Sequence, residues 1–303
     1  MHDPVQFNYF KLVAGYSIDD WLEDDTSASA STHVYLFPRH GQRTSVHHHL
    51  LQTNNNTGPV PGEKNRTCYC LFKAPPSFSH HHVHAFEDQE TGDIVIDRIA
   101  YATRPPLLME SVAPTTSSLA NGAGPGQIQR MRLAAPTVWG TQRSECGECV
   151  AVEILTCSPV CCEMPVVNVA KHGGIGLPLN CIYSVDTCAV LGPWTGINKS
   201  NIARGTNVTW RPKEDRTFVG EPVFVPFPRE ENVVEGEEEE DAGWLLFLGF
   251  HAAEKRSSMY VLDATTMEQV CRVGLKGFIP WSHHCTWNSG VYHDVGVGGS
   301  SKL

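Results

Sequence analysis

The sequence contains no uninterrupted apolar run of about 18 residues, the length that a membrane-spanning helix requires, so a transmembrane role is not expected. Positive charge is also scarce, because 23 lysines and arginines face 33 aspartates and glutamates and give a formal net charge of -10. An acidic surface repels phosphates and anionic lipids, which argues against a nucleic-acid partner and a polybasic membrane patch. A neutral, apolar small molecule is compatible with this charge, as is peripheral contact of an apolar patch with a membrane.

The two ends of the sequence differ in their targeting signals. Met1-His2-Asp3 shows neither the basic start nor the apolar core of a signal peptide. Ser301-Lys302-Leu303 matches the peroxisomal tripeptide, which an import receptor binds at the end of a chain. We therefore expect a peroxisomal location with the import receptor as a partner. Without that signal, the expectation is the cytoplasm, or a plastid if the sequence continues upstream.

The 11 cysteines are odd in number and scattered, which argues against a disulfide framework. Cys146 and Cys149 form one C-x2-C pair, and Cys161 and Cys162 follow it. These four thiols predict, as one alternative, a zinc-stabilised interaction module. A zinc ribbon needs a second C-x2-C, which the sequence lacks, so reduced thiols are the simpler interpretation.

The pattern of short apolar runs predicts an all-β fold. Runs rich in β-branched and aromatic residues recur between Gly, Pro, Asn and Asp clusters, and long helical periodicity is absent. These runs are His33–Phe37, Ile94–Ile99, Val166–Val169, Pro222–Pro226, Trp244–Phe250, Met259–Leu262 and Val270–Val273. The strongest hairpin joins Trp244–Phe250 to Met259–Asp263 through a polar turn at 253–258. Paired strands of this kind build propeller blades.

Three stretches interrupt the strand pattern and are predicted to be loop insertions: residues 44–67, 111–129 and 232–241. The last of them carries much of the acidic excess, and a block of like charges is typically a solvated loop. With 303 residues and 41% hydrophobic content, the chain is large enough for one extensive β domain. We expect a single domain across residues 1–303.

Histidine is unusually abundant, with 15 residues in an acidic chain. Two clusters lie in segments with strand character, Ser79–Glu87 and Pro280–Trp287. Neutral imidazoles that converge from separate strands suit iron, copper or zinc better than calcium or magnesium. The tract His47–His49 lies in an Asn-rich stretch and is interpreted as a surface feature.

Both clusters resemble the iron-binding motifs of the carotenoid cleavage oxygenases, the family that includes apocarotenoid oxygenase, lignostilbene dioxygenase and the retinal-pigment-epithelium isomerase. His84-Ala85-Phe86-Glu87 holds the place of the family's Asn-Ala-aromatic-Glu motif, three residues after a ligand that maps to His81. Pro280–Trp287 aligns with the Pro-x-Gly-Phe-His-Gly-x-Trp motif and puts another ligand at His284. Met1-His2-Asp3-Pro4 resembles a Met-His-Asp-Phe motif, which maps a further ligand to His2.

Other landmarks follow in the family's order. Thr32–Arg39 resembles its Thr-Arg-x-x-x-x-Pro-Arg strand, and Glu163–Asn168 resembles its Glu-Phe-Pro-x-x-Asn segment. Gly220–Pro226 is similar to its Gly-Glu-Pro-x-Phe-Val-Pro pattern. In the family, glutamates accept hydrogen bonds from the iron-bound imidazoles, so the resemblance implies this role for Glu163 and Glu221.

The resemblance implies a seven-bladed β-propeller that holds non-haem Fe(II) and uses O2 as co-substrate. The implied reaction cleaves a conjugated C=C bond of an apolar carotenoid, apocarotenoid or stilbene to carbonyl products, without a side-chain acid, base or nucleophile. Family members are longer and bind iron with four histidines, so this chain is expected to be an incomplete propeller that lacks the blade with the first ligand.

The motifs also depart from the family's pattern. His84 replaces the first motif's Asn, and Ser282, His283 and Cys285 replace the Gly, Phe and Gly beside the last ligand. His283 and Cys285 are themselves metal-binding residue types that compete with His284 for this assignment. A catalytically inactive homologue is therefore an alternative to the oxygenase.

Overall fold

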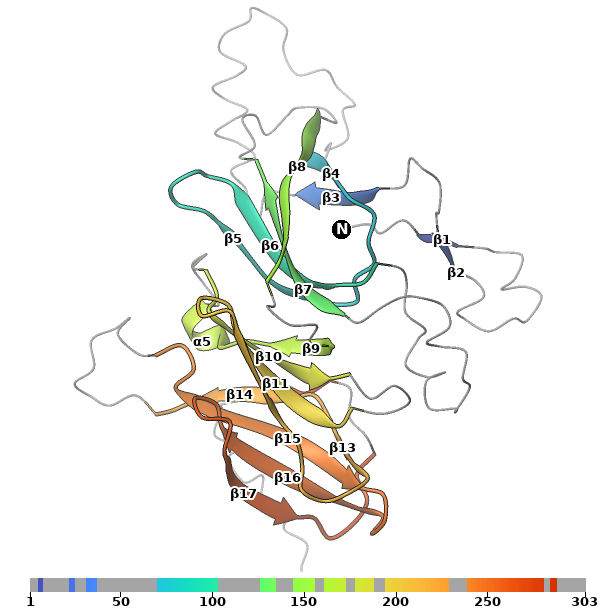
Figure 1. Cartoon of the computed structure of the whole chain (residues 1–303), viewed down its shortest axis with the longest axis vertical. Coiled ribbons are helices and arrows are strands. Elements are labelled where there is room, and N and C mark those ends of the chain that lie inside the picture. Colours follow the sequence, from blue (N-terminus) through green and yellow to red (C-terminus); the bar gives the residue numbers. More distant parts are fainter. Residues whose placement is uncertain are drawn as a thin grey trace, which may run out of the picture.

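In the described part of the computed structural model, the regular secondary structure is almost entirely β-strand (Figure 1). It describes residues 5–7, 22–24, 31–36, 70–102, 126–134, 144–155, 161–172, 178–187, 194–228, 239–280 and 284–287. Within these ranges the helix is α5 (Val169–His172), and no helix there is long and apolar enough to cross a membrane. The predicted all-β class is confirmed.

The first sheet has six strands in the order β3-β4-β8-β7-β6-β5. Their bounds are β3 Thr32–Leu36, β4 Cys70–Ala74, β5 His82–Glu87, β6 Ile94–Ala100, β7 Gln127–Leu133 and β8 Ser144–Ile154. The long β8 runs parallel to β4 in its first half and antiparallel to β7 in its second half. Residues 127–129 of the predicted loop 111–129 therefore lie in a strand, because β7 begins at Gln127.

The second sheet has four antiparallel strands in the order β12-β11-β10-β9. Their bounds are β9 Cys162–Val166, β10 Cys181–Asp186, β11 Gly196–Asn201 and β12 Thr206–Trp210. The strand predicted at Val166–Val169 is displaced, since β9 ends at Val166 and Val169 begins α5. β9 also carries a β-bulge, where Met164 and Pro165 lie opposite the single residue Ser184.

The third sheet is formed by β13 to β17, with β13 and β14 pairing with different halves of β15. Their bounds are β13 Thr217–Val219, β14 Val223–Pro226, β15 Gly243–His251, β16 Arg256–Asp263 and β17 Gln269–Gly274. The predicted hairpin is present, but its turn covers 252–255 instead of 253–258 because Ser257 and Ser258 pair with β15. A separate pair, β1 (Val5–Phe7) and β2 (Leu22–Asp24), lies near the N-terminus.

Two apolar cores join the three large sheets in chain order, from β3 to β17 (Figure 1). All six residues of β10 are buried, because its two faces pack against different neighbours. Ile182 belongs to the core shared with Ile99 and Ile128 of the first sheet. Tyr183 and Val185 belong to the core shared with the third sheet. Stacked sheets of mainly antiparallel strands are the blades of a propeller, and the described sheets do not close into a ring.

Candidate metal centre

His81 lies immediately before β5, on the side of the first sheet that contacts β9 of the second. Its carbonyl oxygen accepts a hydrogen bond of 2.9 Å from the N–H of Ile99 on β6, which fixes the backbone. A register shift between His82 and His84 follows directly. Such bulges re-aim side chains next to functional sites, so His81 stands where a strand is locally distorted.

The His81 imidazole is paired with the carboxylate of Glu163, with 2.6 Å between Nδ1 and Oε2. Because a carboxylate only accepts hydrogen bonds, Nδ1 carries the proton of the neutral ring and Nε2 keeps its lone pair. The pKa of His81 is raised above its ordinary value, chiefly by the hydrogen bond to Glu163. Partial burial opposes this rise, and the negative charges of Glu163 and Glu221 add to it.

Glu163 is buried on β9 and receives two further hydrogen bonds. The hydroxyl of Tyr101 donates to Oε1 at 2.7 Å, and the backbone N–H of Met164 donates to Oε2 at 3.0 Å. Burial raises the pKa of the Tyr101 hydroxyl, and the charge of Glu163 raises it further, so the phenol stays protonated as a donor. A buried carboxylate is costly unless it is hydrogen-bonded, and here each oxygen has a donor.

His284 and Glu221 form the second pair. Their Nδ1 and Oε1 atoms are 3.5 Å apart, and the backbone N–H of Cys285 donates to Oε2 of Glu221 at 2.6 Å. Glu221 directly precedes the Pro222 that leads into β14, whereas His284 lies in the segment 284–287, outside any strand. Cys285, a competing ligand in the sequence interpretation, meets Glu221 through its backbone.

The two pairs meet through their imidazoles. The ring centroids of His81 and His284 are 5.5 Å apart, with the rings inclined at 68°. Residues far apart in the sequence thus place two imidazoles together, each with a carboxylate near Nδ1. In metal sites, a carboxylate on the second ring nitrogen fixes the tautomer and the orientation of the ligand.

Other predicted site residues are not placed by the structure. His2 and His283 lie outside the described residues, as does the tripeptide 301–303. In the described part of the chain, no three His, Cys, Asp or Glu side chains come together as a metal cluster. The thiol of Cys162 donates to the carbonyl of Gly126 at 3.4 Å, and the side chains of Cys146 and Cys149 lie outside the described residues, so the zinc module stays a prediction.

Tyr101 is the site residue that sequence reasoning missed. It follows β6 and pairs through its backbone with Phe78, and the run from Ile94 reads as an ordinary buried strand. Its hydroxyl reaches a carboxylate 62 residues further along the chain. No local pattern signals such a contact.

A family model described as "Retinal pigment epithelial membrane protein" matches residues 25–289 of the chain. The chain belongs to this carotenoid oxygenase family. It is 32% identical over 216 residues to the apocarotenoid-15,15'-oxygenase of Synechocystis, an alignment that covers 69% of this chain and 38% of that protein. It is 39% identical over 106 residues to a chloroplastic 9-cis-epoxycarotenoid dioxygenase of Arabidopsis thaliana, covering 33% of this chain and 16% of that protein.

The carotenoid oxygenase fold is also found among solved structures. A variant of the Synechocystis apocarotenoid oxygenase superposes with a TM-score of 0.65 at 23% identity and covers 94% of this chain and 50% of that one. The cobalt-substituted form of the same enzyme gives a TM-score of 0.63 at 23% identity, covering 92% and 48%. The chain thus spans about half of these structures, and the sheets described above are blades of this oxygenase fold.

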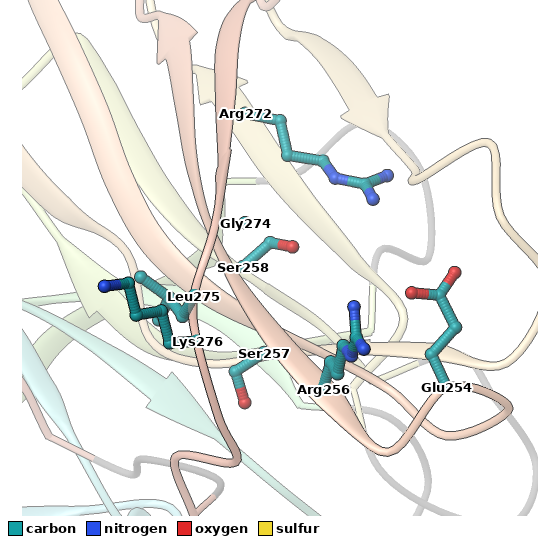
Figure 2. A pocket seen from close by; sticks show the side chains of 8 residues that line it. All are labelled: Glu254, Arg256, Ser257, Ser258, Arg272, Gly274, Leu275 and Lys276. Atoms are coloured by element: carbon teal, nitrogen blue, oxygen red, sulfur yellow. The ribbon is translucent and has the colours of Figure 1, made fainter.

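A hollow of about 350 Å³ lies beside β16 and β17 (Figure 2). It is lined by Glu254, Arg256, Ser257, Ser258, Arg272, Gly274, Leu275 and Lys276. Arg272 donates a hydrogen bond to Glu214, so an acidic group offsets one of the arginines. Its polar and charged lining does not match the apolar site that a carotenoid requires.

Proposed function

We propose that the chain acts as an Fe(II)-dependent oxygenase in which His81 and His284 are metal ligands. His2 is the third ligand in this proposal, and Glu163 and Glu221 orient the two described imidazoles. The observation that carries it is the meeting of the two rings, 5.5 Å between centroids, with a carboxylate beside each Nδ1. Hydrogen-bonded imidazoles that present Nε2 are a common ligand set for iron in proteins.

The residues fit the metal in their chemistry as well as in their placement. Glu163 holds the proton of His81 on Nδ1, which keeps Nε2 available, and its own charge favours a cation nearby. Fe(II), when bound, would supply the activation of O2. The overall reaction consumes one conjugated C=C bond and one O2 and yields two carbonyl groups, so atoms balance without a proton from the protein.

The proposed substrate is an apolar carotenoid, apocarotenoid or stilbene. The similar proteins named above are an apocarotenoid oxygenase and an epoxycarotenoid dioxygenase, which supports this substrate class. The net charge of -10 gives a summed field that disfavours the approach of a phosphorylated substrate, whereas a neutral polyene is unaffected by that charge. The peroxisomal location suggested by Ser301-Lys302-Leu303 belongs to the same proposal.

Metal content tests the proposal first. The protein is purified without oxygen and its iron is measured in the wild type, His81→Ala, His284→Ala and the control His33→Ala, which changes a histidine on β3 near Tyr35. We expect near-stoichiometric iron in the wild type and the control, and loss of iron in the other two. Iron that survives loss of both His81 and His284 would contradict the proposed centre.

The second candidate function is that of an inactive homologue, which binds the metal and an apolar molecule but does not cleave that molecule. The His284 side chain is 66% exposed and 3.5 Å from Glu221, which makes this half of the site looser than the His81 half. An apocarotenal cleavage assay on iron-loaded protein separates the two candidates. Product formation that His284→Ala abolishes favours the oxygenase, and stoichiometric iron with no product favours the inactive homologue.

A further inference from the structure

The hydrogen-bond network behind His81 extends one residue beyond Glu163. Tyr101 is buried, and its hydroxyl donates to Oε1 of Glu163 at 2.7 Å, while His81 Nδ1 occupies Oε2 at 2.6 Å. Both oxygens of one carboxylate are thus committed, one to the imidazole and one to the phenol. Rotation of the carboxylate would break both hydrogen bonds. The bond from the phenol therefore fixes the orientation of the Glu163 carboxylate, and the carboxylate in turn fixes the orientation of the imidazole.

The backbone around Glu163 is shaped for this arrangement. Met164 has a φ of 51°, a left-handed conformation that is unfavourable for a residue other than glycine. It lies in the β9 bulge, and its N–H turns back onto Oε2 of Glu163 at 3.0 Å. Strained backbone positions cluster at functional sites, and this one lies beside a carboxylate whose two oxygens both accept hydrogen bonds.

The phenol itself is held in place by a glycine. A Cβ atom added to Gly126 would lie 2.8 Å from both Cζ and the hydroxyl oxygen of Tyr101, and 2.5 Å from the carbonyl oxygen of Cys162. Any side chain at Gly126 would therefore displace the phenol end. The backbone of Tyr101 is tied on both sides to Phe78, with N–O distances of 2.9 and 3.0 Å.

We infer that Tyr101 is a positioning residue for the metal centre, which orients His81 through Glu163 and thereby raises metal affinity. The inference rests on the proposed function, since it assigns Tyr101 a task at the proposed ligand His81. Tyr101 does not touch the metal in this scheme. Loss of its hydroxyl frees one carboxylate oxygen, and the His81 ring then loses part of its fixed orientation.

The experiment compares Tyr101→Phe with Tyr183→Phe, a matched control. Tyr183 is also buried, and its hydroxyl donates to the carbonyl of Ala264 at 3.0 Å, in the core shared with the third sheet. Co2+ is titrated into metal-free full-length protein and binding is followed by the visible absorption of the bound ion. Removal of a group bonded directly to a metal ligand typically weakens metal binding about 10- to 100-fold. Tyr101 acts one residue further away, through Glu163, so we expect Tyr101→Phe to bind only about 3- to 10-fold more weakly. Tyr183→Phe should stay within about twofold of the wild type, because it leaves that network untouched.

The outcomes separate the inference from the proposed function. A wild type that takes up no Co2+, or a His81→Ala variant that takes up as much as the wild type, refutes the proposed centre. Equal affinities of Tyr101→Phe and the wild type refute the inference alone. The nitrogen-15 signals of the His81 ring in metal-free protein give a readout that needs no metal: they should shift in Tyr101→Phe and not in Tyr183→Phe.

A variant that does not fold still leaves a test on the wild type. The hydroxyl proton of Tyr101 should exchange slowly and be visible by NMR, because it is buried in a hydrogen bond. Addition of Zn2+, which is diamagnetic, should shift that proton if Tyr101 is coupled to the metal ligand. A resonance that stays in place while Zn2+ binds would overturn the inference.

Discussion

The two histidine–glutamate pairs differ in the separation of their atoms and in the exposure of their side chains. In the first, His81 and Glu163 are 2.6 Å apart and their side chains are 28% and 4% exposed. In the second, His284 and Glu221 are 3.5 Å apart and 66% and 11% exposed. The first pair is held between two sheets, whereas His284 stands on a segment outside any strand. One half of the centre is therefore preorganised by the fold, and the other half depends more on what binds there.

Removal of Glu163 breaks the preorganised half and should have the largest effect. In Glu163→Ala the Nδ1–H of His81, the hydroxyl of Tyr101 and the N–H of Met164 lose their acceptor in a buried site. Each buried unsatisfied donor costs about 1–3 kcal/mol, so we expect the free energy of unfolding to fall by about 3 kcal/mol or more. For Glu221→Ala, where the histidine is exposed, we expect about 1 kcal/mol. Urea unfolding of the metal-free proteins measures both, and equal losses would show that the pairs are equivalent.

The histidines themselves should separate stability from metal binding. His81→Ala leaves a buried carboxylate without one of its donors, and we expect the free energy of unfolding of the metal-free protein to fall by about 1–2 kcal/mol. His284→Ala removes an exposed side chain and should change it by less than about 0.5 kcal/mol. Both variants should lose bound iron to a similar degree. Thermal unfolding with and without metal tests this, and a large loss of metal-free stability in His284→Ala would contradict it.

Strands were predictable from the sequence where their residues are apolar enough to pack against a core. The run from Trp244 to Phe250 is apolar and aromatic and is followed by a polar turn, so the β15–β16 hairpin was predictable. β9 was not, because it contains a glutamate, a proline and a methionine in a left-handed conformation, none of which signals a strand. The predicted strand Val166–Val169 therefore starts four residues and ends three residues later than β9.

The candidate centre was predictable in part, through motifs rather than through geometry. The resemblance put His81, His284, Glu163 and Glu221 on the candidate site, and the structure brings these four together. The role of Tyr101 was beyond reach, since its contact depends on the packing of two sheets and on Gly126 lacking a side chain. The pattern of residues in a single sequence shows neither the packing of the two sheets nor the need for a glycine at that position.

The reactivity of two cysteines should show the same contrast between the His81 half and the His284 half of the centre, without any mutation of the protein. Cys162 precedes Glu163 and is buried, with its thiol bonded to the carbonyl of Gly126, whereas Cys285 follows His284 and is exposed. Alkylation needs access to the sulfur, so iodoacetamide should modify Cys285 in the native protein and Cys162 only after denaturation. Mass spectrometry of the peptides measures both, with the exposed Cys271 on β17 as the reference.

Addition of metal should change the alkylation rate of Cys285 but not that of Cys271. Binding at His284 should order the segment 284–287 and slow the alkylation of Cys285 about 3-fold or more, because ordered segments open less often. Cys271 should react at the same rate with and without Co2+, since it lies on β17 away from Glu221. If Cys162 instead reacts as fast as Cys271 before any metal is added, the His81 half opens in solution, and the difference in preorganisation between the halves does not hold.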